Sequence, residues 1–333
     1  MNISPSLHQD LRAAVADLPS ARLLPGLLRV GFLTIGLVAA LTLAWSSDSW
    51  IEFGLWNVLA GFCYAFLLIS THDAVHHTLT GWIWFDEAFP RLVSWPMLWP
   101  HGIYAELHHL HHGWNGVNLR DPERLQWTQA EYQQASPLMR WYVRHHWIVD
   151  TGVMGGIGQI IKTWRHGFRF RGDRPRLGRQ MALDGAGICI AQLLLMGLLF
   201  AHSGSFWQYL LGWLVLERVI ALVVRSRDHL EHYGLWGDHG SFQLTQLYTC
   251  RNFNVPTLVN WLMGGLPYHS VHHAFPWIPF TQLPEAHRRI QAVLAQHQLP
   301  PLTIDTGYLV DTLRRSHQPP QLVCTKLAMV LEQ

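Results

Sequence analysis

Four apolar segments, each long enough or nearly long enough to cross a bilayer, constrain this 333-residue chain more than any other feature. Crossing the hydrocarbon core takes roughly 20 helical residues, and only helices or closed barrels satisfy their backbone polar groups there. The sequence therefore predicts an all-α, polytopic membrane protein whose four transmembrane helices form two hairpins. The predicted spans are residues 27–45, 53–71, 185–201 and 206–225.

Lysine and arginine are distributed unevenly between the connecting segments. The two predicted hairpin turns, residues 46–52 and 202–205, contain none, whereas residues 72–183 between the hairpins contain twelve. The positive-inside rule therefore places both termini and the central segment in the cytosol. The net charge of the whole chain is only +2, so we expect no nucleic-acid partner.

Four histidine-rich stretches lie outside the apolar cores of the spans. THDAVHH follows the second span, HHLHH lies between the hairpins, RDHLEHYGLW follows the fourth span, and YHSVHH lies in the C-terminal region. In the predicted topology all four emerge on the same side of the membrane, which makes a shared site possible. The 22 histidines far outnumber the four cysteines, which show no CxxC spacing, so any metal site is expected to use nitrogen ligands.

The spacing of these histidines directs several imidazoles to one side of a helix. Positions i, i+3 and i+4 share a helix face, and HxxHH occurs twice, with one HxxxH and one further histidine after the fourth span. Nine imidazoles are too many for one tetrahedral zinc but suit two five- or six-coordinate ions such as iron. The candidate ligands are His72, His76, His108, His111, His112, His232, His269, His272 and His273.

HxxxH, HxxHH and HxxHH in this order and topology resemble the integral-membrane fatty acid desaturase and hydroxylase superfamily. NLRDPER, after the second cluster, and HHAFPWIPFTQLPEAHRRI, at the last one, are similar to family elements at those places. The resemblance covers about residues 30–295. It implies two non-haem iron ions held by the nine histidines, O2 as co-substrate, and a cytosolic helical cap that holds the metal site.

The resemblance also implies a division of the chain. We expect a cytosolic N-terminal segment at 1–26, a membrane desaturase-like domain at 27–295 and a cytosolic C-terminal tail at 296–333. The chain resembles a bacterial branch, so the expected location is the bacterial inner membrane, with the active site and both termini in the cytosol.

Two adjacent residues are candidates for completing the metal shell. Acyl-CoA desaturases carry an asparagine four residues before the histidine that His232 matches, whereas this chain has Asp228 there and His229 beside it. Either one is a candidate for the outer, catalytic position. His77 and His109 lie off the shared helix faces and are expected beside the ligands or in solvent.

The reaction implied by the resemblance is formation of a carbon–carbon double bond in a fatty acyl or alkyl substrate. DHLEHYGLW, however, is similar to a stretch of alkane monooxygenases, so hydroxylation at the same diiron site is an alternative. Oxidative decarboxylation of a free fatty acid to a terminal alkene also occurs in this broad group. The chain has no redox-cofactor motif, so a separate electron donor is expected: a ferredoxin, a rubredoxin or a cytochrome b5-like protein.

A histidine-rich metal transporter is the competing class of protein. Transporters place their ligands near the bilayer midplane between discontinuous helices, whereas these histidines follow the spans, which argues against transport. Glu217 and Arg218 lie inside the fourth predicted span, where charges are costly and often functional. They could line a substrate channel or form a structural ion pair with a neighbouring helix.

Overall fold

The computed structural model describes residues 5–201 and 204–323. The described chain is mostly helical, and its strands are two-residue segments in parallel pairs. β1 (Trp127–Thr128) pairs with β4 (Leu322–Val323), and β2 (Asn252–Phe253) pairs with β3 (Ile304–Asp305). The predicted all-α fold is confirmed. Residues 202–203 of the second hairpin turn and 324–333 of the predicted tail lie outside the described residues.

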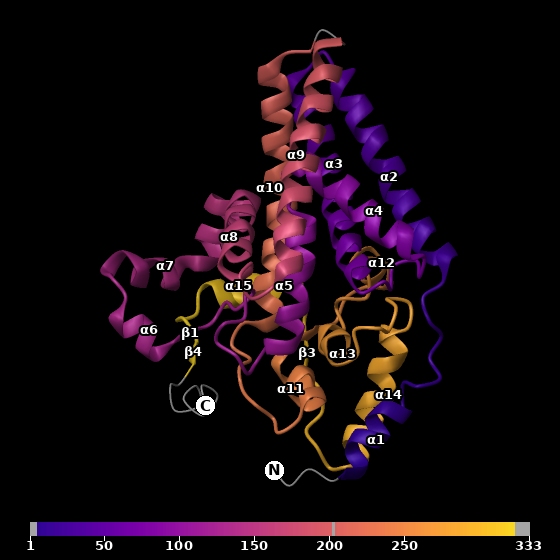
Figure 1. The fold of residues 1–333 in the computed structure, drawn as a ribbon, viewed down its shortest axis with the longest axis vertical. Helices are drawn as coiled ribbons and strands as arrows, with labels where there is room; N and C mark the ends of the chain where they lie inside the picture. Colours follow the sequence, from indigo (N-terminus) through magenta and orange to yellow (C-terminus); the bar gives the residue numbers. More distant parts are fainter. Residues whose placement is uncertain (1–4, 202–203, 324–333) are drawn as a thin grey trace. The chain divides into compact units, whose positions relative to one another are not determined.

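Four helices are long and apolar enough to cross a membrane, as predicted (Figure 1). Two of them, α3 and α10, continue beyond their apolar stretches and carry His72 and His232 on the added turns. Nothing in these added turns breaks a helix, because they contain neither proline nor glycine. The four helices are α2 (Leu23–Trp45), α3 (Trp50–Val75), α9 (Pro175–Ala201) and α10 (Phe206–His232).

The chain divides into two compact units. One unit, here called the membrane unit, comprises residues 22–109 and 148–226; the second unit comprises residues 1–21, 110–147 and 227–333. Three boundaries fall inside helices, in α5 (His101–Trp114), at the last residue of α7 (Pro137–Ile148) and in α10, so each of these helices contributes residues to both units.

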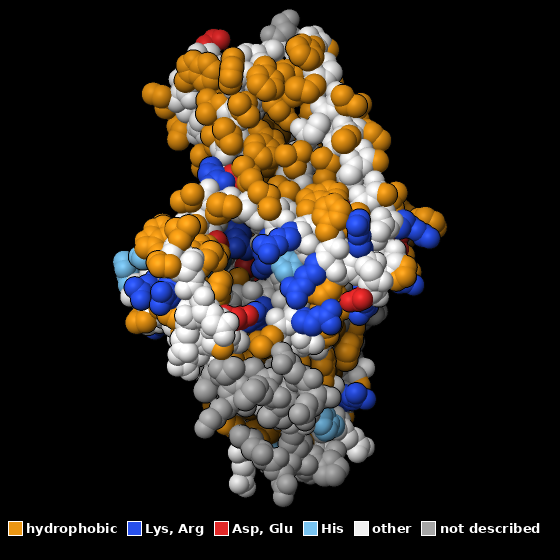
Figure 2. All heavy atoms as spheres, turned by 60° about the vertical axis from the view of Figure 1, so that its left-hand side comes forward, with side chains coloured by type: hydrophobic (Ala, Val, Ile, Leu, Met, Phe, Trp, Pro, Cys, Tyr) orange, Lys and Arg blue, Asp and Glu red, His pale blue; other side chains and the backbone are white. Residues whose placement is uncertain are grey.

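Helix α2 packs along α3 within the membrane unit. Two glycines on these helices permit close approach of other segments, Gly26 of α2 to the residues after α3 and Gly61 of α3 to α10. A Cβ at Gly26 would lie 2.1 Å from the carbonyl oxygen of Leu79, and one at Gly61 would lie 2.7 Å from Val219. Figure 2 shows hydrophobic side chains covering the upper part of the molecule, around the meeting ends of α9 and α10. The remaining elements of this unit are α4 (Ile83–Ser94), η1 (Trp95–Met97), the π-helical η2 (Val149–Met154) and α8 (Gly155–Phe170).

The contacts of Glu217 and Arg218 support the structural alternative for this charged pair. Glu217 is buried and accepts a hydrogen bond from the Ile157 amide (3.0 Å), while Arg218 Nη2 lies 2.6 Å from Glu217 Oε1. Arg218 also donates to the carbonyl oxygens of Gly152 and Val153, at 3.1 Å each. The pair therefore holds the π-helical turn η2 against α10.

The second unit has its own hydrophobic core, which surrounds a short histidine-bearing helix, α13 (His269–Ala274). Leu7 and Leu11 of α1 (Pro5–Ala13) join this core with Val271 of α13 and Ile290 of α14 (Leu283–Gln296). All six residues of α13 are buried. The other helices are α6 (Gln129–Gln134), α7 (Pro137–Ile148), α11 (Phe242–Thr249), α12 (Thr257–Leu262) and α15 (Tyr308–Ser316).

The predicted orientation in the membrane is testable by cysteine labelling in intact cells. In a background without the native cysteines, Ser47→Cys in the first hairpin turn should react with a membrane-impermeant maleimide. Asp173→Cys, in the exposed turn after α8, should react only after permeabilisation, because the positive-inside rule retains the neighbouring arginines in the cytosol. Reaction of the residue-173 variant in intact cells would overturn the orientation.

Candidate metal centre

Three of the predicted ligands gather within the membrane unit. His72 on α3, His76 at the end of α3, and His108 on α5 each offer a ring nitrogen within 4.8 Å of the other two. The ring centroids of His72 and His108 are 4.6 Å apart, and those of His72 and His76 are 5.4 Å apart. His72 and His108 are almost completely buried. These three are called the membrane-unit histidines below.

The way α3 ends fixes the direction of its last histidine. His77 adopts a left-handed conformation (φ 54°), and the amides of His77 and Thr78 donate to the carbonyl oxygens of Ala74 and Asp73, at 3.0 Å each. This is the Schellman pattern of hydrogen bonds, which stops a helix at a defined residue. His76 is the C-cap of this motif, and His77 is exposed, in agreement with its predicted position off the ligand face.

A buried ion pair lies beside His72. Asp73 Oδ2 accepts a hydrogen bond from Arg29 Nη1 of α2 at 2.6 Å, and Asp73 Oδ1 lies 3.5 Å from His72 Nδ1. Both charged side chains are at most 4% exposed. Breaking a buried pair by removing one partner typically costs about 3–5 kcal/mol, so Arg29 strongly constrains the carboxylate that faces the His72 ring.

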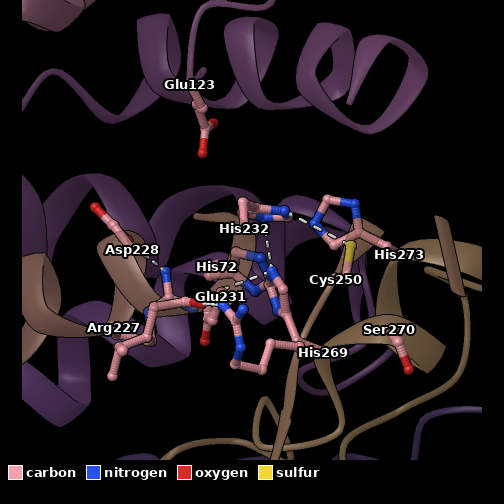
Figure 3. A network of polar contacts seen from close by, with 12 residues as sticks. His72, Glu123, Arg227, Asp228, Glu231, His232, Cys250, His269, Ser270 and His273 are labelled. Carbon is pink, nitrogen blue, oxygen red and sulfur yellow. Dashed lines mark hydrogen bonds and ion pairs between the residues drawn. The ribbon is translucent and has the colours of Figure 1, made fainter. Parts of the chain in front are cut away.

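The other six predicted ligands gather within the second unit. His111, His232 and His273 offer ring nitrogens within 4.8 Å of one another. His269 Nε2 lies 2.9 Å from His232 Nε2, and the ring of His112 stacks on that of His273 with centroids 4.1 Å apart. Figure 3 shows His232, His269 and His273 converging from α10 and α13. The second-unit histidines are His111, His112, His232, His269, His272 and His273.

Hydrogen bonds fix the tautomers of two second-unit histidines. His111 Nδ1 lies 2.9 Å from Asp121 Oδ2, and His273 Nδ1 lies 3.0 Å from Gln246 Oε1. Both partners are acceptors, so each Nδ1 carries the proton and each Nε2 keeps a lone pair. Nε2 of His273 is buried and has no hydrogen-bond partner among the described residues. A metal ion accepts such a lone pair, so these residues fit iron or another ion that prefers imidazole.

A buried amide network holds Gln246 in place. Asn115 Nδ2 donates to Gln246 Oε1 (3.1 Å) and to Thr249 Oγ1 (2.9 Å), while Gln246 Nε2 donates back to the Asn115 carbonyl oxygen (3.1 Å). The oxygen of Gln246 therefore faces His273, and its nitrogen faces the carbonyl oxygen of Asn115, the residue directly after α5. The network positions the His273 ring through one intermediate residue.

A carboxylate also reaches the second-unit histidines. Glu231 Oε2 lies 3.4 Å from His269 Nε2 and 3.3 Å from Arg227 Nη1. Tyr308, from the C-terminal helix α15, donates to Glu231 Oε1 at 3.3 Å. Figure 3 shows Glu231 beside Arg227 and His269. The segment around Tyr308 is therefore folded onto the site, although it lies within the predicted tail.

Burial keeps these imidazoles neutral. Desolvation lowers the pKa of His269 and His273 well below the usual value, and neighbouring imidazoles lower it further. A neutral imidazole is the form that binds metal. The lowered pKa values thus leave both side chains ready to act as ligands at neutral pH.

The two candidates for the outer position have other neighbours in the structure. Asp228 accepts a hydrogen bond from Arg227 at 3.1 Å, and His229 lies against His146 and Trp147, with ring centroids 5.3 and 5.0 Å away. Their role in completing the metal shell stays a prediction. His109 is exposed, as expected for a residue off the ligand face.

Three positioning residues were not singled out from the sequence: Arg29, Asn115 and Gln246. Arg29 lies inside the first predicted span, and because a charge there usually has a partner, this signal could have identified it. Asn115 follows HHLHHGW, and Gln246 lies within FQLTQLYT, which matches none of the histidine motifs. Their contacts join parts of the chain that are far apart in the sequence, so no local pattern marks them.

Gln246→Leu should lower iron affinity about 10- to 100-fold, the usual effect of losing a residue that orients a metal ligand. Leucine keeps the volume but removes the acceptor for His273 Nδ1–H. Metal content after dialysis against graded chelator measures the effect. Gln243→Leu, one turn earlier on α11 and also buried, is the matched control. Equal iron retention by the two variants would contradict the role of Gln246.

Comparison with known proteins adds independent information. A family model described as fatty acid desaturase matches residues 48–304. The Delta(8)-fatty-acid desaturase of Euglena gracilis is 25% identical over 267 residues, which are 73% of this chain and 62% of that protein. A Delta 8-(E)-sphingolipid desaturase of Kluyveromyces lactis is 21% identical over 286 residues, covering 77% of this chain and 48% of that protein. The chain therefore spans only about half to three fifths of the length of these relatives.

Proposed function

Because this chain belongs to the fatty acid desaturase family, we propose that it forms a carbon–carbon double bond in a fatty acyl chain, using two non-haem iron ions and O2. The observation that carries the proposal is a set of nine buried or half-buried histidines, three of them in the membrane unit and six in the second unit. Helix α5 carries members of both groups, with His108 one turn before His111 and His112.

The donor set supports two ions better than one. An octahedral ion accepts six ligands, so one ion cannot use nine imidazoles. His111 and His273 donate their Nδ1–H groups to Asp121 and Gln246, which leaves a lone pair on each Nε2, and imidazole nitrogen suits iron. Asp228 or His229 would complete the shell.

The bound iron would supply the means to activate O2 and remove hydrogen from an unactivated C–H bond. The residues of this chain then have three tasks. They hold the ions through neutral imidazoles, fix ring orientation through Asp73, Asp121 and Gln246, and exclude water by burying the site. Precise placement matters, because an error of about 1 Å between reacting groups can cost 100-fold in rate.

The electron balance requires a partner protein. Removing two hydrogen atoms from an alkyl chain while reducing O2 to two water molecules consumes two further electrons and two protons. The chain has no motif for a redox cofactor, so a ferredoxin, a rubredoxin or a cytochrome b5-like protein would supply the electrons. The arginines between the hairpins would suit an acidic donor.

The relatives support a lipid substrate. Their names describe a fatty-acid desaturase and a sphingolipid desaturase, which share a long hydrocarbon chain as the group acted on. We propose a fatty acyl chain as the substrate and the bacterial inner membrane as its location, with the site facing the cytosol. Hydroxylation at the same irons is the second candidate, because EHYGL at 231–235 resembles alkane monooxygenases.

Protein purified in mild detergent from iron-supplemented cells should contain close to two irons per chain. Nine clustered imidazoles motivate this number, since a single ion would leave at least three of them unused. Metal analysis by inductively coupled plasma mass spectrometry measures it. Stoichiometric zinc without iron, under the same metal-supplemented growth, would contradict the redox proposal.

A further inference from the structure

A mostly apolar cavity of about 770 Å³ lies within the membrane unit, apart from the histidines. This volume falls in the range of about 300–1,000 Å³ that is common for small-molecule pockets. Its walls come from all four long helices, and Pro96 and Met97 of η1 contribute to its lining. Representative wall residues are Leu41, Asn57, Leu199 and Trp213.

One polar atom in this wall lacks a partner. Asn57 is 1% exposed, and its Nδ2 donates to the Phe53 carbonyl oxygen at 2.8 Å. Its Oδ1 is buried and has no hydrogen-bond partner among the described residues. Because Nδ2 already faces an acceptor, the orientation of the amide is fixed and Oδ1 is the atom left over.

Three hydroxyl groups of the wall already donate to other acceptors. The hydroxyl of Thr42 donates to Val38 O at 2.8 Å, that of Tyr64 to Val93 O at 2.7 Å, and that of Tyr209 to Gln192 Oε1 at 2.9 Å. Glycine at position 212 keeps the neighbourhood of the amide open, since a Cβ there would lie 3.3 Å from Asn57 Oδ1. The cavity thus combines mostly apolar walls with a buried amide oxygen that has no hydrogen-bond partner among the described residues.

The orphan acceptor lies at the end of the cavity wall on α3 that is farther from the metal centre. Tyr64, also in the wall, lies eight residues before His72, about 12 Å at 1.5 Å per residue, whereas Asn57 lies 15 residues before His72, about 22 Å. Asn57 also lies seven residues inside the start of α3, about 10 Å from that end. At this depth in a bilayer, water is scarce and hydrocarbon is abundant.

We propose that this cavity is a binding site for a long-chain molecule with one hydroxyl group, of the fatty alcohol class. Its alkyl chain lies against the apolar walls, and its hydroxyl donates to Asn57 Oδ1. A plain alkane would fill the same walls but would leave the acceptor unsatisfied. The site is independent of the proposed reaction, since no histidine of the metal centre contributes to its lining.

The test uses the full chain in mild detergent and a fatty alcohol carrying a photoreactive diazirine. Unlabelled 1-hexadecanol should compete for labelling about tenfold better than hexadecane, which reflects one added hydrogen bond. Labelled peptides should come from α3 and α10. In the Asn57→Leu variant the preference for the alcohol should disappear. Both proteins are measured in the same detergent, so that the partitioning of each competitor into micelles is the same in the two measurements.

Two further variants make the result decisive. Thr42→Val also removes a polar group from the wall, but one already bonded to its own helix, so it should keep the preference. Gly212→Ala places a methyl group beside Asn57 Oδ1, so this variant should lose the preference for the alcohol. An unfolding temperature and a gel-filtration profile equal to those of the unsubstituted chain report correct folding of each variant. An unchanged alcohol preference in folded Asn57→Leu or Gly212→Ala, or saturable labelling confined to other helices, would overturn the proposal.

Discussion

Replacing His272 with alanine should abolish product formation and lower iron affinity by more than about 100-fold, beyond the effect typical of a residue that only orients a ligand. His272 is 3% exposed on α13, and its ring centroid lies 5.0 Å from that of His112. Alanine removes a proposed ligand and leaves a space within a buried site. Product yield and iron per chain, measured on the same preparation, test both parts.

The matched control for this prediction is His287→Ala. His287 is also a buried histidine of the second unit and packs against Tyr268 with ring centroids 5.2 Å apart, but it belongs to neither group of proposed ligands. The His287→Ala variant should retain its iron content and its product yield, even if its unfolding temperature falls. If His272→Ala retained both iron and product at the level of His287→Ala, His272 would not be a ligand.

The membrane part of the fold could be predicted because hydropathy acts locally. Each apolar segment must satisfy its own backbone in a bilayer, so length and composition are enough to identify a helix. The same reasoning placed the spans at 53–71 and 206–225, but the helices extend to Val75 and His232. Hydropathy detects where the hydrocarbon contact ends, whereas the helix continues as long as its residues permit.

The groups of histidines could be anticipated in part. HxxHH at 108–112 and 269–273 does lie on helices, α5 and α13, so the rule for shared helix faces was sound. The supporting residues could not be anticipated in the same way. Gln246 meets His273, and Arg29 meets Asp73, only after the chain folds, and these contacts span 27 and 44 residues. No periodicity in the sequence encodes them.

The C-terminal segment illustrates the same limit. Residues 296–333 are expected from the sequence to form a cytosolic C-terminal tail outside the desaturase-like domain. In the structure, Ile304–Asp305 pairs with Asn252–Phe253, and Tyr308 reaches Glu231 beside His269. Two-residue strands and single side-chain contacts leave no recognisable sequence signal, yet they connect this segment to the site.

The main product from a fatty acyl substrate should be an alkene with an internal double bond. Removing one hydrogen leaves a carbon radical, and three outcomes then compete: return of oxygen gives an alcohol, loss of a second hydrogen gives an alkene, and loss of an adjacent carboxylate gives a shortened terminal alkene. All three can use the same ligands. The choice depends on where the site holds the substrate carbon, and small displacements change the rates by orders of magnitude.

Three sequence features favour the alkene, and one favours the alcohol. The HxxHH spacing of the second cluster, the C-terminal consensus around His272 and the family match over residues 48–304 are desaturase-like, whereas EHYGL is hydroxylase-like. The assay supplies deuterated fatty acids, acyl lipids and n-alkanes with a reductase–ferredoxin pair and identifies products by mass spectrometry. A desaturated acyl product should have lost two deuterium atoms from adjacent carbons. Alcohols as the sole products, with two irons per chain, would reject desaturation and retain the metal centre, while a terminal alkene one carbon shorter would assign decarboxylation.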